Sequence, residues 1–245
     1  MRELVLLHAF PMGAGLFDDV RVPEGWRVHA PSLPGFDGTP LPPAGSTALD
    51  DYAEGVLAWL DGRGIETCVL GGVSMGGYVT AALWRLAPER IHGLLFIDTR
   101  AGADSDQARA GRDAMVAMLR RDGVGGVADE MVPKLLGGTT RRDQPAVEAR
   151  LCALIGRQTP GAVAGAIVRI RDRADATPVL STIDVPTLVV VGDEDVITPV
   201  AEAERIQVLV PGARLARIPA AGHLPPMETP DAFNHVLRGF LSSLP

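Results

Sequence analysis

Short apolar runs alternate with longer amphipathic segments along the chain, and this alternation constrains the fold more than any other feature. Near-continuous apolar runs are typical of strands that helices cover on both faces of a parallel sheet. The sequence predicts strands over residues 3–8, 26–30, 67–73, 93–97, 187–191 and 213–218. We therefore expect an α/β protein with a mostly parallel, doubly wound sheet of about six strands.

The segments between these runs carry apolar residues at helical spacing. Helices are expected over residues 49–60, 76–86, 199–210 and 230–241. Residues 101–182 form a much longer connection than a strand-to-strand crossover needs, with helix-like pieces over residues 105–121, 125–136, 142–157 and 161–175. We expect residues 1–100 and 183–245 to form a core domain, and residues 101–182 a helical cap, or lid, inserted between two strands.

Composition and charge argue against several classes of protein. The net charge is −7 and no dense Lys/Arg run is present, so we expect neither nucleic-acid nor membrane-surface binding. The longest uncharged stretch, residues 68–84, is too short to span a bilayer and is interrupted by glycines. Glu3, His8 and Pro11 argue against a signal segment at the start.

The two cysteines suggest neither a disulfide framework nor a zinc site. Cys68 and Cys152 lie in separate apolar segments, without a second cysteine or a histidine at ligand spacing. We expect both to be buried, inert thiols in a cytoplasmic protein that needs no metal or cofactor. The sequence does not indicate an oligomeric state.

A G-x-S-x-G pattern over residues 72–76 follows an apolar run directly and precedes a helical segment. A nucleophile elbow has this context, because its sharp turn needs small residues beside the serine. The same pattern also fits an ordinary tight turn. Since a serine is a weak nucleophile by itself, the functional interpretation of Ser74 requires a carboxylate and a histidine later in the chain.

Both partners are present in the required order. Asp195 follows the apolar run at residues 187–191, and His223 follows the last predicted strand. Taken singly, Asp195 also fits a solvated acidic turn, and His223 also fits a loop histidine without a partner. Because all three residues follow strands at the same sheet edge, we predict a Ser74-His223-Asp195 triad. Asp98, which also ends a strand, is the alternative acid; its competing role is to cap the start of the lid through Thr99 and Arg100.

Acyl transfer also requires hydrogen-bond donors for the oxyanion that develops on the substrate. The amide of Met75, directly after the serine, is the first candidate. The amide of Phe10, in the loop after the first strand, is the second, because the next residue, Pro11, has no N–H to donate.

These motifs resemble those of the α/β-hydrolase fold family, in particular its small capped members such as 3-oxoadipate enol-lactonase-like hydrolases and carboxylesterases. The resemblance covers nearly the whole chain. HAFP at residues 8–11 resembles the family's H-G-x-P segment, and SLPGFDG at residues 32–38 its D-L-P-G-x-G-x-S segment. Gly192–Asp195 resembles the G-x-x-D acid loop, which favours Asp195 over Asp193, and Gly222-His223 resembles the G-H motif that contains the base.

The sequence departs from the family pattern at several points. Ala9 replaces a glycine, Ser32 replaces an aspartate, and the chain begins at what would be the family's third strand, so we expect six strands. The elbow presents Ser74 rather than an aspartate, which argues against the haloalkane dehalogenase and epoxide hydrolase branches.

The resemblance implies a serine hydrolase that cleaves a carboxylic ester or lactone of a small molecule through an acyl-enzyme. The alternatives are C–C bond hydrolysis, cofactor-free perhydrolysis, and a ligand-binding protein with little turnover. Arg100, Arg169 and Arg171 are candidates for binding an acidic substrate, although solvated lid arginines are the preferred interpretation.

Overall fold

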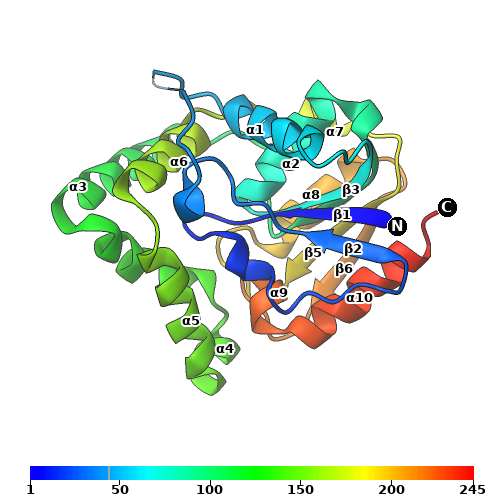
Figure 1. Cartoon of the computed structure of the whole chain (residues 1–245). Coiled ribbons are helices and arrows are strands. Elements are labelled where there is room, and N and C mark those ends of the chain that lie inside the picture. Colours follow the sequence, from blue (N-terminus) through cyan, green and yellow to red (C-terminus); the bar gives the residue numbers. More distant parts are fainter. Residues whose placement is uncertain (44) are drawn as a thin grey trace.

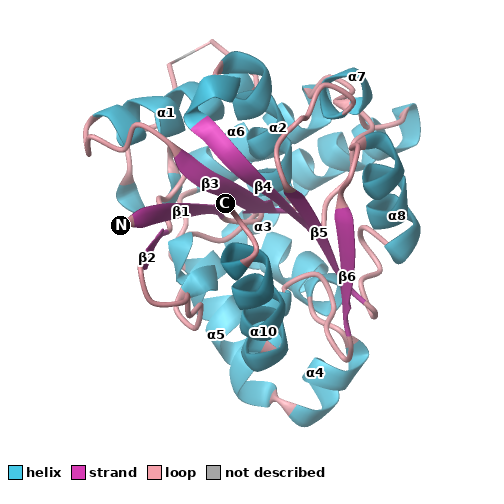
Figure 2. Ribbon diagram, turned by 90° about the vertical axis from the view of Figure 1, so that its right-hand side faces the viewer, coloured by secondary structure: helices cyan, strands magenta, loops and turns pink. Residues whose placement is uncertain are grey.

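The computed structural model describes residues 1–43 and 45–245. Within them, six parallel strands form one sheet in the order β2-β1-β3-β4-β5-β6 (Figures 1 and 2). The strands are β1 (Arg2–Leu7), β2 (Trp26–His29), β3 (Cys68–Val73), β4 (Ile91–Ile97), β5 (Thr187–Gly192) and β6 (Arg214–Ile218). Each begins and ends within two residues of its predicted position, so the α/β prediction is confirmed.

The central strands contain long apolar runs because both of their faces are covered. Every residue of β3 and β5 is buried, as are Leu4–Leu7 in β1. The edge strands β2 and β6 have one buried residue each, Trp26 and Ile218. This contrast explains why the central strands show near-continuous apolar runs.

Helices cover both faces of the sheet. Helices α1 (Asp50–Asp61), α2 (Met75–Leu86) and α8 (Val200–Leu209) lie on one face, and α10 (Pro230–Ser242) lies on the other (Figures 1 and 2). These are the four helices predicted for the core. The short helices η1 (Ala14–Phe17), η2 (Phe36–Gly38), η3 (Pro88–Arg90) and α9 (Pro225–Glu228) were not predicted.

The long connection between β4 and β5 is helical, and most of it lies beyond the carboxyl ends of the strands (Figure 1). Its helices are α3 (Asp106–Leu135), α4 (Gly138–Asp143), α5 (Pro145–Gly156), α6 (Pro160–Asp172) and α7 (Thr177–Leu180). A backbone break at Gly123, with φ 70°, divides α3 between the two predicted pieces. The helix predicted over residues 142–157 is wrong at its start, because Pro145 begins a new helix there.

Polar side chains connect these helices to the core. Gln158 donates to the carboxylate of Asp37 at 2.8 Å and accepts the Asp37 amide at 2.9 Å. Arg169, a predicted surface arginine, is instead buried, 2.5 Å from Asp51, so that expectation was wrong for Arg169. Arg171 is partly exposed and pairs with Asp113 and Asp172.

One expectation about the cysteines was also wrong. Cys68 is buried in β3, and burial raises the pKa of its thiol to about 12. Cys152 is exposed on α5. In the described residues, no single helix is long and apolar enough to cross a bilayer; only α5 and α6 taken together, bent by 97°, reach that length and composition.

Candidate active site

The three predicted triad residues follow three different strands of the sheet. Ser74 follows β3, Asp195 lies three residues after β5, and His223 lies in the loop between β6 and α9. Because all the strands are parallel, their carboxyl ends meet at one edge, and α3–α6 lie beyond that edge (Figure 1). The topology thus brings the three loops together below the inserted helices.

The turn at Ser74 has the geometry of a nucleophile elbow. Ser74 has φ 55° and ψ −111°, an uncommon conformation for a residue with a side chain, and it directly precedes α2. Its amide donates to Ile97 O at 2.9 Å, and its carbonyl accepts the Thr99 hydroxyl at 2.8 Å. These contacts with the end of β4 hold the strained turn in place.

The flanking glycines are required by close backbone approaches. A Cβ atom on Gly72 would lie 2.1 Å from the Gly76 carbonyl, and one on Gly76 would lie 2.1 Å from Leu7 O. Backbone cannot move away as a flexible side chain can. The pattern read in the sequence therefore reflects steric need at both glycines.

We expect Gly76→Ala to lower the free energy of unfolding by about 3 kcal/mol, the upper range for an overpacked core. Gly239→Ala is the matched control, because a Cβ on this exposed α10 glycine meets nothing within 4 Å. It should raise stability by about 0.5–1 kcal/mol. Urea unfolding of both variants measures the difference; equal midpoints would contradict the steric argument.

His223 is hydrogen-bonded to Asp195. The distance from His223 Nδ1 to Asp195 Oδ2 is 2.7 Å, and both side chains are almost fully buried. Since a carboxylate only accepts, Nδ1 carries the proton, and Nε2 of a neutral imidazole is then unprotonated. The His223 amide donates to Leu135 O at 3.0 Å, which fixes the loop against the end of α3.

Asp195 is held as a carboxylate by several donors. Its Oδ1 accepts the amides of Ile197 and Thr198, at 2.8 and 3.0 Å, and its Oδ2 accepts the Thr198 hydroxyl at 2.6 Å. Burial alone would raise the pKa of Asp195, but the charge of His223 and the hydrogen bonds from His223 and Thr198 lower it to about 2. Asp195 is thus the acid that contacts the histidine.

Asp98 lies behind this pair. Its Oδ1 accepts the Gly192 amide at 2.8 Å, while its Oδ2 is buried without a partner in the described residues. Burial and the nearby charge of Asp195 raise the pKa of Asp98 well above its usual value. The suggested role as a cap for the lid is wrong, because Asp98 binds the end of β5 instead.

Ser74 and His223 line one cavity of about 220 Å³ between the sheet edge and the inserted helices. Phe10 also lines it, as do Met131 and Leu135 of α3. No hydrogen bond joins Ser74 Oγ to His223 within the described residues. Such contacts are often long without substrate and tighten when it binds.

The two candidate oxyanion donors are the amide of Met75, next to Ser74 in the chain, and the amide of Phe10, in the wall of the same cavity as Ser74. Met75 begins α2, so its amide has no acceptor within the helix. Phe10 lies in the loop after β1 and lines the cavity. Neither amide donates to a backbone acceptor in the described part of the chain.

His8 fixes the loop that contains Phe10. His8 is fully buried, its Nδ1 lies 3.0 Å from Ala9 O, and its Nε2 accepts the Leu33 amide at 3.0 Å. It therefore ties the loop after β1 to the loop after β2. Burial lowers the pKa of His8 to about 4, so the imidazole is neutral in the folded protein.

We expect stability to fall by about 3 kcal/mol between pH 6.5 and pH 4 through His8. In this range the unfolded chain binds a proton at His8 that the folded protein excludes, so lower pH favours unfolding. His8→Gln retains an acceptor and does not titrate. Urea unfolding of both proteins across this range should give the variant the flatter curve; parallel curves would contradict the prediction.

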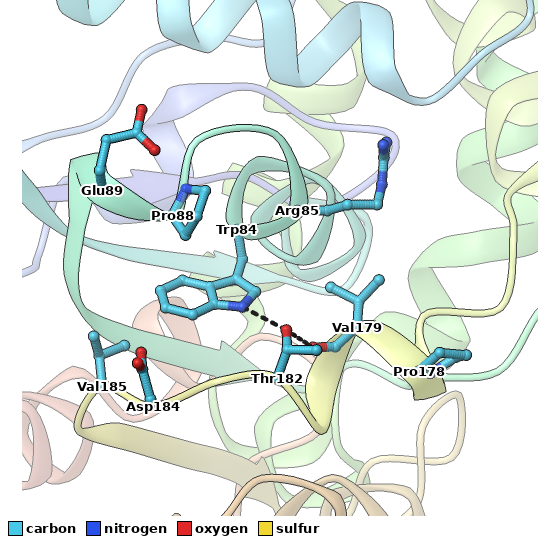
Figure 3. A pocket seen from close by; sticks show the side chains of 9 residues that line it. All are labelled: Trp84, Arg85, Pro88, Glu89, Pro178, Val179, Thr182, Asp184 and Val185. Carbon is cyan, nitrogen blue, oxygen red and sulfur yellow. Dashed lines mark hydrogen bonds between the residues drawn. The ribbon is translucent and has the colours of Figure 1, made fainter.

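A larger cavity lies elsewhere. It has a volume of about 590 Å³ and lies at the amino ends of β4 and β5, opposite the triad (Figure 3). Trp84 points into it and donates to the Thr182 hydroxyl at 3.1 Å. Its described lining includes no histidine, cysteine or serine, so it has no nucleophile and base pair.

Asp98, Asp195 and His223 also have the spacing of metal ligands, with one ligand atom from each within 4.8 Å of the others. However, the hydrogen bond between His223 Nδ1 and Asp195 Oδ2 uses both of these atoms. A metal ion bound by these two atoms would replace that hydrogen bond. The arrangement therefore favours proton transfer by His223 over metal binding.

Several site residues were not predicted from the sequence. Thr198, three residues after Asp195, was detectable, because hydroxyl residues at this spacing commonly bond to an aspartate. Glu228 accepts the amides of Gly137 and Leu224, at 2.8 and 2.9 Å, and so joins the start of α4 to the loop of His223. Nothing local in the sequence indicates that contact.

Known proteins resemble this chain over most of its length. A thermophilic esterase from Thermogutta terrifontis, solved with malate bound, is 34% identical with a TM-score of 0.94, and the match covers 100% of this chain and 90% of that one. A pimeloyl-[acyl-carrier protein] methyl ester esterase of Neisseria meningitidis serogroup A is 28% identical over 100% of this chain and 78% of its own length. The 3-oxoadipate enol-lactonase 2 of Acinetobacter baylyi is 26% identical over 83% of this chain and 74% of its own.

The family itself is shown by a match to nearly the whole sequence. The profile of the alpha/beta hydrolase family matches residues 4–236, a range that contains all of the sheet except the first two residues of β1, together with the helices between β4 and β5. With the six-stranded parallel sheet, this match establishes that the chain belongs to the alpha/beta hydrolase family.

Proposed function

We propose that this protein is a serine hydrolase that cleaves a carboxylic ester or lactone of a small molecule through an acyl-enzyme. The observation that carries the proposal is that His223, held by a buried hydrogen bond to Asp195, lines the same cavity as Ser74. This arrangement supplies a nucleophile, a base and an orienting carboxylate. The esterases and the enol-lactonase among the relatives support the same reaction class.

The proposed reaction begins when Ser74 Oγ attacks the carbonyl carbon and His223 Nε2 takes its proton. Asp195 holds the imidazole in the required tautomer and stabilises its charged form. The tetrahedral intermediate collapses, the C–O bond to the leaving group breaks, and His223 returns the proton to the leaving alkoxide. Water, activated by His223, then hydrolyses the acyl-enzyme.

The amides of Phe10 and Met75 stabilise the oxyanion in both steps. Preorganised donors are effective where charge develops, and removal of one typically costs about 10²–10³ in rate. We further propose that residues 101–182 act as the lid, because the α3 residues Met131 and Leu135 line the cavity. Their apolar side chains exclude bulk water from the acyl-enzyme.

The first experiment is hydrolysis of p-nitrophenyl esters from acetate to decanoate by the wild-type protein, together with labelling by a fluorophosphonate. We expect turnover of at least the short esters and a single adduct at Ser74, identified by peptide mass spectrometry. An absence of both turnover and labelling would contradict the proposal. Labelling of another serine would assign the nucleophile elsewhere.

A further inference from the structure

Two arginines line the cavity that contains Ser74 and His223. Arg100 follows β4, and Arg112 lies in α3, so they approach from the core and from the cap. Both are partly buried. Of the three arginines that the sequence suggests for substrate binding, Arg100 lines this cavity and Arg169 and Arg171 do not; nothing in the sequence pointed to Arg112.

Arg112 has unused hydrogen-bonding capacity. Its Nε donates to Asp104 Oδ2 at 3.1 Å, and neither of its terminal nitrogens has an acceptor in the described residues. Asp104 does not need this contact for its own neutralisation. The buried guanidinium of Arg173 lies 2.5 Å from Asp104 Oδ1 and also donates to the carbonyls of Gly102 and Ile170.

Arg100 also has an N–H donor without an acceptor in the described residues. One terminal nitrogen donates to Ile197 O, while its buried Nε has no partner in the described part of the chain. A guanidinium group has five N–H donors and stays charged in proteins. Arg100 lines the cavity, and among the described residues it forms no ion pair with a carboxylate.

The charges around the cavity are unequal. Arg112 and Arg173 both contact the carboxylate of Asp104, and Arg100 lines the same cavity as Asp104 and Arg112. Of the other carboxyl groups close by, Asp195 is bonded to His223 and Thr198, and Asp98 is buried behind that pair, where burial and the charge of Asp195 raise its pKa. Burying a positive charge is costly unless an anion balances it, so this excess favours a negatively charged ligand.

We propose that the substrate is an ester or lactone that carries a second, ionised carboxylate, which Arg100 and Arg112 bind while Ser74 attacks the ester carbonyl. The planar donors of a guanidinium match a carboxylate in two parallel hydrogen bonds. The inference rests on the proposed hydrolase function and deepens it. It places the charged end of the substrate between the core and α3.

The test compares pairs of esters that differ only in charge. Monomethyl adipate carries the carboxylate in its acyl part, and methyl 5-carbamoylpentanoate is its neutral amide isostere. The 4-acetoxybutanoate anion and 4-acetoxybutanamide form the corresponding pair for the leaving group. We expect kcat/KM for the anion to exceed that for the amide by about tenfold or more in at least one pair.

The variant of choice is Arg112→Gln, because Asp104 keeps its contact with Arg173 and the fold is spared. We expect the anion-to-amide ratio of kcat/KM to fall about tenfold, mainly through a higher KM for the anion. Arg112→Lys should restore part of the ratio. Arg171→Gln, which removes a cap arginine outside the cavity, should leave the ratio unchanged.

Arg100→Gln is the second variant, and for this variant only the anion-to-amide ratio of kcat/KM is informative. Its loss also removes the contact with Ile197, two residues after Asp195, so both esters of a pair should react more slowly. The kcat/KM for the anion should nevertheless fall more than the kcat/KM for the amide. If both variants keep the wild-type ratio, the assignment of the two arginines is wrong.

The outcomes separate this inference from the proposed function. Anion-to-amide ratios near one for both pairs, with Ser74-dependent turnover of p-nitrophenyl esters, would overturn the inference and leave the hydrolase proposal standing. If no ester is cleaved and Ser74 is not labelled, the hydrolase proposal fails and the inference fails with it.

Discussion

Ser74→Ala is expected to lower kcat/KM for every ester that the protein cleaves by about 10⁵-fold or more. The change removes the only atom that forms the covalent bond in the proposed acyl-enzyme. What remains is binding and oxyanion stabilisation, which typically leave about 10³–10⁴-fold acceleration over water. The measurement is turnover of the best p-nitrophenyl ester by matched preparations of the two proteins.

The control for this variant is its stability. The Ser74 side chain makes no capping hydrogen bond to α2, and both alanine and serine carry a Cβ at the same positive φ. The free energy of unfolding should therefore change by no more than about 0.5 kcal/mol. A stable Ser74→Ala protein that keeps a tenth of the activity would show that another group is the nucleophile.

The sheet was predictable because burial on both faces leaves a strong local signature. β3 and β5 are buried throughout and consist almost entirely of apolar residues and glycine, and the turns that follow them are rich in small or acidic residues. The candidate triad was predictable for a related reason. Parallel strands bring their carboxyl ends to one edge, so residues far apart in sequence share a site if each follows a strand.

The helices between β4 and β5 were less predictable, because their contacts are with distant segments of the chain. Arg169 resembles a surface arginine in its helix, yet Asp51, 118 positions earlier in the chain, provides a buried partner. Arg112 enters the cavity only because the chain between β4 and α3 returns over the sheet edge. Local propensity does not contain this information, since tertiary contacts decide which side of a helix is buried.

Asp195→Asn is expected to lower kcat by about 10⁴-fold, whereas Asp98→Asn should lower it less than about tenfold. An asparagine at 195 can turn its NH₂ group toward His223 Nδ1, which then accepts and leaves the proton on Nε2. That tautomer cannot act as the base. Turnover of the same ester by both variants measures the contrast, and the opposite order would make Asp98 the catalytic acid.

The reason for the small effect at Asp98 is that its folded environment favours the protonated form, which asparagine resembles in size and charge. The raised pKa of Asp98 means that the folded protein binds a proton there that the unfolded chain releases as the pH rises above about 3.8. The stability contributed by this proton is present below that pH and is lost as the pH rises toward the folded pKa. An asparagine does not titrate, so the Asp98→Asn variant avoids this loss and should be more stable than the wild-type protein at neutral pH. The side-chain oxygen of the asparagine can still accept the Gly192 amide, as Asp98 Oδ1 does. Loss of stability at neutral pH, together with loss of activity, would instead show that Asp98 acts as a charged partner in the site.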